Sequence, residues 1–182
     1  MSFEELLIRN AAETIMGIKC GSLLPLSQVN SYQADTFKVL EENGMMAKRL
    51  RKKNRSPLLF LYRKEMLENI LSERHARRIL SYFGYEGNAE SCIEKLSRRF
   101  DAERCPDEVG IFLGYPPEDV EMYIINGGKG YKHSALWKVY TDEEKAKRVL
   151  EEVLECRKRC SSLYEECKDI RKLIDYSRRK ER

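Results

Sequence analysis

The sequence predicts a single α+β domain, in which a small, mostly antiparallel sheet of three or four strands is covered by helices. The chain has 182 residues, of which 42% are hydrophobic, enough to bury one core without disulfide bonds. Segments with the apolar spacing of amphipathic helices alternate with short apolar segments typical of strands. Neither an internal repeat nor a Pro- or Ser-rich linker interrupts the chain. We therefore expect one domain that ends in a long helix.

The N-terminal part of the chain is predicted to begin with a helix and a strand. Ser2 and Glu5 form the capping-box pattern that opens an amphipathic helix, which we expect to end near Thr14. Glycine and proline punctuate the next apolar segment, which predicts a strand over residues 17–24. Helical spacing returns over residues 30–42, before an Asn-Gly pair typical of a helix end.

Residues 46–52 and 57–63 are predicted to form a β-hairpin. The second arm is apolar over residues 57–62, so both of its faces should be covered, and it should be the central strand of the sheet. The first arm alternates only in part and carries many charges, which is typical of an edge strand protected from pairing with other chains.

The rest of the chain is predicted to be mainly helical. A strand is expected at residues 134–140, after a glycine-rich loop. Thr141 and Glu144 form a second capping box, and the helix that it opens is predicted to run past Ile174. Apolar spacing predicts the other helices over residues 65–71, 73–83, 89–100, 107–113 and 118–125.

The sequence shows neither a membrane span nor a secretory signal. Its longest apolar stretch, residues 57–62, is far shorter than the ~18 residues needed to cross a bilayer. The N-terminus is acidic and amphipathic, unlike a signal peptide. With six cysteines and no signal, we expect a soluble cytoplasmic protein with reduced thiols and no membrane partner.

Three cysteines share one face of the predicted last helix with three aliphatic residues. At about 100° per residue, all six fall on one narrow stripe. A metal site usually needs a close C-x-x-C pair, so we expect no metal and no cofactor. An apolar stripe on a charged helix must face a dry surface, either the body of the domain or a second copy in a homodimer. The stripe comprises Cys156, Cys160, Leu163, Cys167, Ile170 and Ile174.

Positive charge is concentrated in the middle of the chain. The net charge is +4 overall but +8 when counted over residues 45–99. One run in the predicted hairpin has the density of basic residues that phosphate contacts require. No aromatic residue is interleaved for base stacking, and a lysine-rich edge strand explains the run equally well. The candidate nucleic-acid residues are Lys48, Arg49, Arg51, Lys52, Lys53 and Arg55.

The remaining motifs indicate packing rather than catalysis. Residues 107–125 resemble a helix–turn–helix, but the second helix is acidic and would repel phosphates. The loop at residues 127–130 lacks the spacing of a phosphate-binding loop. Neither His75 nor His133 stands at an interpretable sequence distance from a nucleophile or a carboxylate. We predict no catalytic residue, and an enzyme would need a cleft that brings His133 to a carboxylate or to Cys20.

Five segments of the chain together resemble the sequence pattern of one protein family. They are residues 17–19, 59–63, 106–120, 137–140 and 142–146, of which the third is the longest and the most specific. Together they resemble DUF3793, a bacterial family of unknown function. The resemblance covers residues 1–160 and implies a compact cytoplasmic bacterial domain there, with residues 161–182 as a charged helical extension. It implies no particular activity, cofactor or partner.

Three cations and three aromatic residues within or beside these segments predict a pocket for a small anionic ligand. Each cation lies in a predicted strand that is otherwise apolar, where a charge is costly unless it is paired or faces a solvated cleft. The aromatic side chains would form the walls of that cleft. The alternative is that the cations reach solvent at strand ends and the aromatic rings fill the core. The set is Lys19, Arg63, Tyr115, Trp137, Lys138 and Tyr140.

These observations favour a non-enzymatic binding or accessory module that engages a small anionic ligand or a protein partner. Nucleic-acid binding through residues 48–55 is the alternative, and a small enzyme of unknown reaction is the third class. The first interpretation requires the predicted cations and aromatic residues to converge on one cleft. The second requires an affinity that falls steeply with salt concentration.

Overall fold

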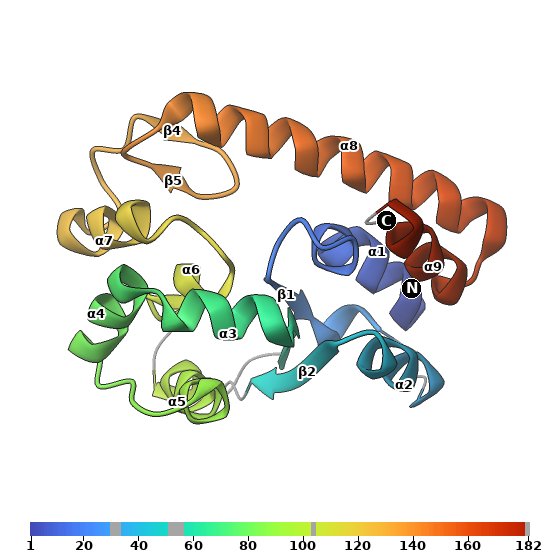
Figure 1. Cartoon of the computed structure of the whole chain (residues 1–182), viewed down its shortest axis with the longest axis horizontal. Coiled ribbons are helices and arrows are strands. Elements are labelled where there is room, and N and C mark those ends of the chain that lie inside the picture. Colours follow the sequence, from blue (N-terminus) through green and yellow to red (C-terminus); the bar gives the residue numbers. More distant parts are fainter. Residues whose placement is uncertain (30–33, 51–56, 103–104, 181–182) are drawn as a thin grey trace.

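A three-stranded antiparallel sheet separates two groups of helices in the computed structural model (Figure 1). The structure describes residues 1–29, 34–50, 57–102 and 105–180. Side chains alternate between the faces of a strand, so Leu59 and Leu61 enter one hydrophobic core and Phe60 enters the other. The second hairpin arm is therefore the central strand, as predicted. The strands lie in the order β1 (Gly21–Pro25), β3 (Leu58–Arg63) and β2 (Met45–Leu50).

The first group of helices packs on the face of the sheet that carries Leu59 and Leu61. The predicted capping box opens α1: the Ser2 hydroxyl accepts from the Glu5 backbone N–H, and the Glu5 carboxylate accepts from the Ser2 backbone N–H. A short 3-10 helix, Leu26–Gln28, follows β1. The group consists of α1 (Phe3–Ile15), α2 (Ala34–Glu42), α8 (Glu143–Cys167) and α9 (Ile170–Lys180).

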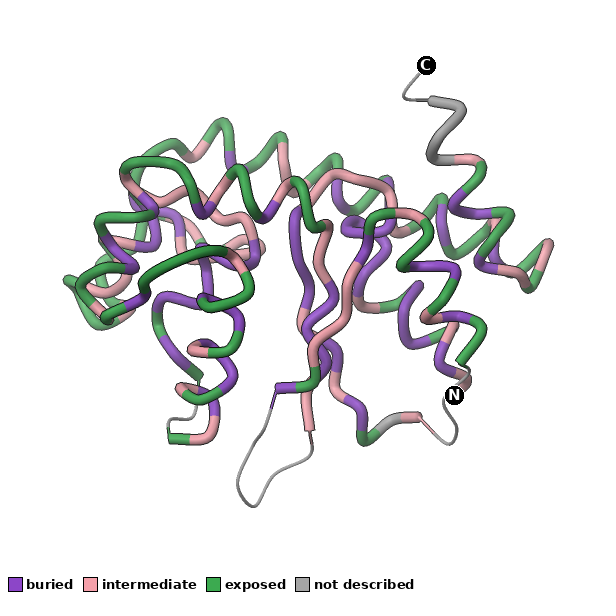
Figure 2. The backbone as a smooth tube through the Cα atoms, turned by 60° about the horizontal axis from the view of Figure 1, so that its bottom comes forward, coloured by how far each residue is buried: buried purple, intermediate pink, exposed green. Residues whose placement is uncertain are grey.

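The second group packs on the opposite face, around the fully buried rings of Phe60, Phe100 and Phe112. Figure 2 shows the strands between the two groups of helices. The predicted α+β class is confirmed, and so are the helices expected over residues 65–71, 73–83 and 89–100. No helix among the described residues is long and apolar enough to cross a membrane. The group consists of α3 (Lys64–Ser72), α4 (Arg74–Tyr82), α5 (Ala89–Ala102), α6 (Val109–Phe112) and α7 (Pro117–Asn126).

The first strand is shorter than the sequence predicts. It begins at Gly21 instead of Gly17, which has a φ of 78° in the left-handed region. The backbone N–H groups of Ile18 and Lys19 donate to the Glu13 carbonyl oxygen, at 2.9 and 3.1 Å. These bonds complete the C-terminus of α1, so the residues before Gly21 form a turn and Lys19 is not a strand residue.

The strand predicted for residues 134–140 is a small hairpin instead. Its arms are β4 (His133–Ser134) and β5 (Lys138–Val139), which pair with each other and form a second sheet. The Ala135 N–H donates to the Trp137 carbonyl oxygen at 3.0 Å, and this contact reverses the chain. A strand pattern reveals neither its partner nor an internal reversal, which explains the error.

The last helix is also interrupted, and it begins one residue later than predicted. Asp142 caps α8 by accepting from the Lys145 N–H at 2.9 Å, whereas the Thr141 hydroxyl is bonded elsewhere. Lys168 has a φ of 47° and ends α8. The break lets α9 change direction, so that Ile170, Leu173 and Ile174 reach the core of the first group. This burial explains why one continuous helix does not form.

The cysteine stripe faces the body of the domain in α8. Cys156 and Cys160 are buried, with their Sγ atoms 3.9 Å apart, as predicted. Cys167 is only half-buried because it occupies the last turn of α8. No group of His, Cys, Asp and Glu that could hold a metal ion occurs in the part of the chain that the structure describes. A homodimer through the last helix stays a prediction.

We expect the cysteines to react in the order of their exposure. Cys105 is exposed and should be alkylated first at neutral pH, whereas Cys20, Cys156 and Cys160 should be protected. Burial raises the pKa of the Cys20 thiol to about 12, which further slows its reaction. Timed alkylation followed by peptide mass spectrometry measures these rates, with Cys105→Ser as the control. Equal rates for the buried and exposed cysteines would contradict the expectation.

Candidate functional site

The Arg63 side chain binds the C-terminal end of α1. Its side chain, at the end of β3, donates from Nε to the Thr14 carbonyl oxygen at 2.7 Å and from the second guanidinium nitrogen to the Ile15 carbonyl oxygen. These two carbonyl groups belong to the last turn of α1, where intrahelical donors are missing and a cation is favourable. Arg63 therefore joins the sheet to α1 and lies outside the pocket described below.

Lys19 is paired within a buried charge cluster, which we call the Glu13 cluster (Glu13, Lys19 and Arg157). Glu13 is fully buried; its carboxylate lies 3.5 Å from Lys19 Nζ and accepts from Arg157 at 2.7 and 3.0 Å. Burial alone would raise the pKa of Glu13, but the hydrogen bonds from Arg157 and the charge of Lys19 hold it below its ordinary value. Burial likewise lowers the pKa of Lys19, against the attraction of Glu13. The cluster connects α1, the turn that follows it, and α8.

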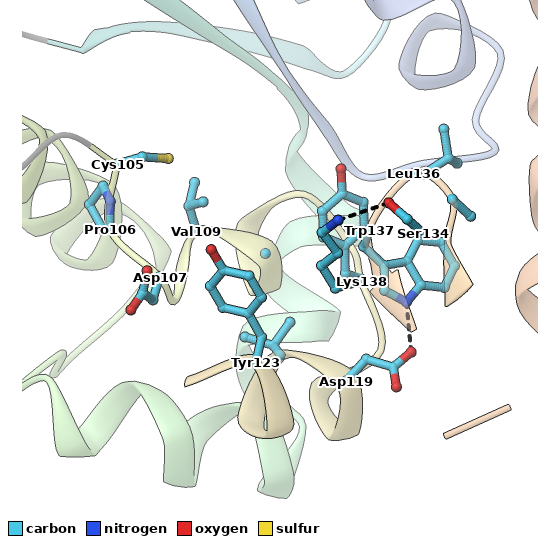
Figure 3. A pocket seen from close by; sticks show the side chains of 14 residues that line it. Cys105, Pro106, Asp107, Val109, Asp119, Tyr123, Ser134, Leu136, Trp137 and Lys138 are labelled. Atoms are coloured by element: carbon cyan, nitrogen blue, oxygen red, sulfur yellow. Dashed lines mark hydrogen bonds between the residues drawn. The ribbon is translucent and has the colours of Figure 1, made fainter. Parts of the chain in front are cut away.

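A pocket of about 320 Å³ lies between α6, α7 and the β4–β5 hairpin (Figure 3). Three of the six predicted ligand residues line it: Tyr115, Trp137 and Lys138. The rings of Tyr115 and Trp137 are stacked, with centroids 5.3 Å apart and planes inclined by 28°. The remaining lining residues are Cys105, Pro106, Asp107, Val109, Gly110, Asp119, Val120, Tyr123, Ser134, Ala135 and Leu136.

Tyr115 connects this pocket to the Glu13 cluster. Lys19 Nζ lies 5.5 Å from the centroid of the Tyr115 ring, which also stacks on Trp137. Burial, and after it the charge of Glu13, raises the pKa of the Tyr115 hydroxyl to about 12. Tyr115 is therefore neutral at physiological pH. Lys19 thus supports the wall of the pocket without lining it.

Asp119 fixes the hairpin wall of the pocket to α7. One carboxylate oxygen accepts from Trp137 Nε1 at 2.6 Å, as Figure 3 shows. The other accepts from the Tyr140 N–H, the Thr141 N–H and the Thr141 hydroxyl, each at 2.9 Å. Asp119 is 2% exposed, so these bonds replace the water that it loses on burial.

Among the residues that line the pocket, Lys138 is the cation. Lys138 Nζ donates to the Ser134 hydroxyl at 3.0 Å and lies 3.9 Å from the centroid of the Tyr131 ring. Among the described residues no carboxylate pairs with Lys138. Tyr140, the last predicted ligand residue, does not line the pocket. Its ring is buried, and its hydroxyl has no hydrogen-bond partner among the described residues. Its backbone N–H donates to Asp119.

Most of the predicted nucleic-acid residues lie outside the described residues. These are Arg51, Lys52, Lys53 and Arg55. Lys48 forms an ion pair with Glu94 of α5, and Arg49 is exposed on β2. An ion pair with α5 gives Lys48 a structural partner, so nucleic-acid binding through residues 48–55 stays a prediction.

The two histidines lie in different surroundings. His75 of α4 lies between two carboxylates of α7: Nε2 is 2.8 Å from Glu121 and Nδ1 is 3.4 Å from Glu118. Its hydrogen bond, with those of Arg78, keeps the pKa of Glu121 below its ordinary value. His133 lies half-buried in β4, and the Cys20 thiol donates to the Phe112 carbonyl oxygen. The His75 contacts join two helices, and the enzyme class remains a prediction.

Sequence reasoning missed the residues that complete the pocket. Asp107, Asp119 and Tyr123 lie within the predicted helical corner, which was interpreted as packing alone. The spacing of Asp119 and Tyr123 places them on one face of α7, a signal that was present in the sequence. A second buried carboxylate in this region, Glu108, accepts from Tyr85 and Arg99 and serves the core.

The described residues form an α+β fold with a pocket of ligand size that has aromatic walls and a lysine. A model of the family "Protein of unknown function (DUF3793)" matches residues 7–174. The chain belongs to this family, as its resemblance predicted. No curated protein and no solved structure matches the chain.

Proposed function

We propose that the protein is a non-enzymatic binding module whose pocket between α6, α7 and the β4–β5 hairpin takes a small anionic molecule with a flat, apolar body. The observation that carries the proposal is the stacked Tyr115–Trp137 wall beside the Lys138 ammonium group. Aromatic walls with a few polar groups are typical of ligand sites. The proposal includes a cytoplasmic setting, for which free cysteines are typical, and the bacterial origin that the family resemblance implies.

The size of the pocket limits the ligand. Its volume of about 320 Å³ is at the lower end of known ligand sites, which favours a molecule of about one ring with short substituents. A flat ring fits beside the Tyr115–Trp137 stack because aromatic rings prefer offset or edge contacts. Lys138 supplies the charge for the anionic group, since it has no acidic partner among the described residues.

The single tryptophan of the chain gives a direct test. Small aryl carboxylates, aryl phosphates and aliphatic organic acids are titrated while Trp137 emission and the thermal midpoint are recorded. We expect flat aryl acids to change both. Lys138→Gln should weaken their binding about tenfold, because a hydrogen bond to a charged group contributes about 1.5–3 kcal/mol.

Lys129→Gln provides the matched control, because Lys129 is exposed on the loop before the hairpin and the substitution removes the same charge. It should leave the affinity unchanged. The proposal fails if no anion alters Trp137 emission or the thermal midpoint. It also fails if the two lysine substitutions weaken binding equally, since that result would indicate nonspecific attraction.

A further inference from the structure

The pocket contains an acidic group that a purely anionic ligand would leave unused. Asp107, in the segment before α6, lines the pocket and is exposed. Its carboxylate makes no hydrogen bond or ion pair with another described residue. Figure 3 shows Asp107 and Lys138 on either side of the Tyr123 ring. Opposite charges therefore stand at two separated places in one cavity.

The Lys138 end has the donors that an anion requires. Lys138 Nζ donates to the Ser134 hydroxyl, which leaves the Ser134 O–H free to donate in turn. An ammonium group and a hydroxyl that both donate suit a carboxylate or a phosphate oxygen. Both side chains line the pocket, and both belong to the same hairpin.

The part of the pocket between Asp107 and Lys138 has no charged side chain in Figure 3, which favours placing a second charged group of the ligand at the other end. Figure 3 shows Val109 and the Tyr123 ring in this part, and Val120 and Leu136 also line the pocket. A charged group buried there would lose its hydration without compensation.

Asp107 is better suited than Asp119 to receive a positive group. Both carboxylates line the pocket, but the oxygens of Asp119 already accept four hydrogen bonds from the Trp137 indole and the hairpin end. The carboxylate of Asp107 has no hydrogen-bond partner among the described residues, and an ionised carboxylate can only accept hydrogen bonds. A protonated amine at that position would gain an ion pair.

Resting on the proposed function, we propose that the ligand is bipolar: a flat ring with an anionic group at Lys138 and Ser134, and a protonated amine at Asp107. The class is that of aminoalkyl or amino-substituted aryl acids. The apolar middle of the pocket holds the ring beside the Tyr115–Trp137 wall, and the two charges set its direction. A ligand with only one of the two charges would leave one end of the pocket unpaired.

Four size-matched probes test this inference on the full chain: 4-(aminomethyl)benzoate and its 3-isomer carry both charges, 4-methylbenzoate only the anion, and 4-methylbenzylamine only the cation. Trp137 emission and calorimetry measure the affinities. We expect one of the two bipolar isomers to bind about tenfold more tightly than 4-methylbenzoate. Asp107→Asn should remove that advantage and leave 4-methylbenzoate unaffected, while Lys138→Gln weakens both.

Asp175→Asn, at an exposed position on α9, is the matched control and should change no affinity. The thermal midpoints of Asp107→Asn and wild type should agree, because an exposed substitution of this kind changes stability little. If 4-methylbenzoate binds as tightly as both bipolar isomers, or if Asp107→Asn weakens both classes equally, the bipolar ligand is refuted and the anion pocket stands. If none of the three acids binds, the proposed function and this inference fail together.

Discussion

Glu13→Gln is expected to lower the free energy of unfolding by about 3–5 kcal/mol, the range found when one partner of a buried ion pair is removed. The wild-type carboxylate is 1% exposed and neutralises Lys19, whose side chain is only 13% exposed. Glutamine keeps the shape but has one acceptor oxygen instead of two, and it leaves Lys19 and Arg157 beside each other without a negative charge. The desolvation of Lys19 is then uncompensated.

Urea denaturation followed by circular dichroism measures this loss. Glu41→Gln, at an exposed position on α2, is the matched control and should stay within about 0.5 kcal/mol of wild type. Adding Lys19→Met to Glu13→Gln should recover part of the stability, because it removes one of the two stranded cations. A Glu13→Gln protein as stable as the control would contradict the assigned charge cluster.

The same substitution should change the pH dependence of stability. The pKa of Glu13 in the folded state lies below its ordinary value of 4.5, so the unfolded chain takes up this proton first as the pH falls. The stabilisation is therefore complete above pH 4.5 and is lost as the pH falls through the folded-state pKa. Wild type should lose stability more steeply than Glu13→Gln across this acid range. Parallel curves would show that Glu13 does not titrate as described.

Asp119→Asn is expected to lower the free energy of unfolding by about 2–4 kcal/mol, because hydrogen bonds to charged groups contribute about 1.5–3 kcal/mol each. Asparagine has one acceptor oxygen, and its NH2 group would face either the Trp137 indole N–H or the N–H groups of Tyr140 and Thr141. At least one buried donor is left unsatisfied. The hairpin wall of the pocket should loosen as a result.

Trp137 reports this change directly. Its emission maximum should move to longer wavelength in the native variant, because the indole leaves its stack on Tyr115 and meets water. Asp142→Asn is the matched control: Asn is as good an N-cap as Asp, so α8 should keep its stability and Trp137 its emission. Unchanged emission in Asp119→Asn would show that the hairpin is held by other contacts.

The candidate site was predictable only in part. Tyr115, Trp137 and Lys138 were expected to share a pocket, and the structure brings them to one cavity. Lys19 and Arg63 were expected to join them because each was assigned to an apolar strand. That reasoning shows that a buried cation needs a partner, but it does not show which residue the partner is. Lys19 instead pairs with Glu13 of the helix just before it, and Arg63 pairs with the carbonyl groups that end that helix, far from it in the sequence.

The sequence by itself determined the local structure: the capping box of α1, the helices of the second group, and the central position of β3. These depend on interactions between residues close in the chain, and on the rule that a strand apolar on both faces must be covered on both. Only the tertiary structure decided the pairing of β4 with β5, the break at Lys168 and the position of Asp119 under the hairpin. Each of these depends on contacts between segments that are distant in the sequence. The free energy of such contacts cannot be inferred from the pattern of neighbouring residues.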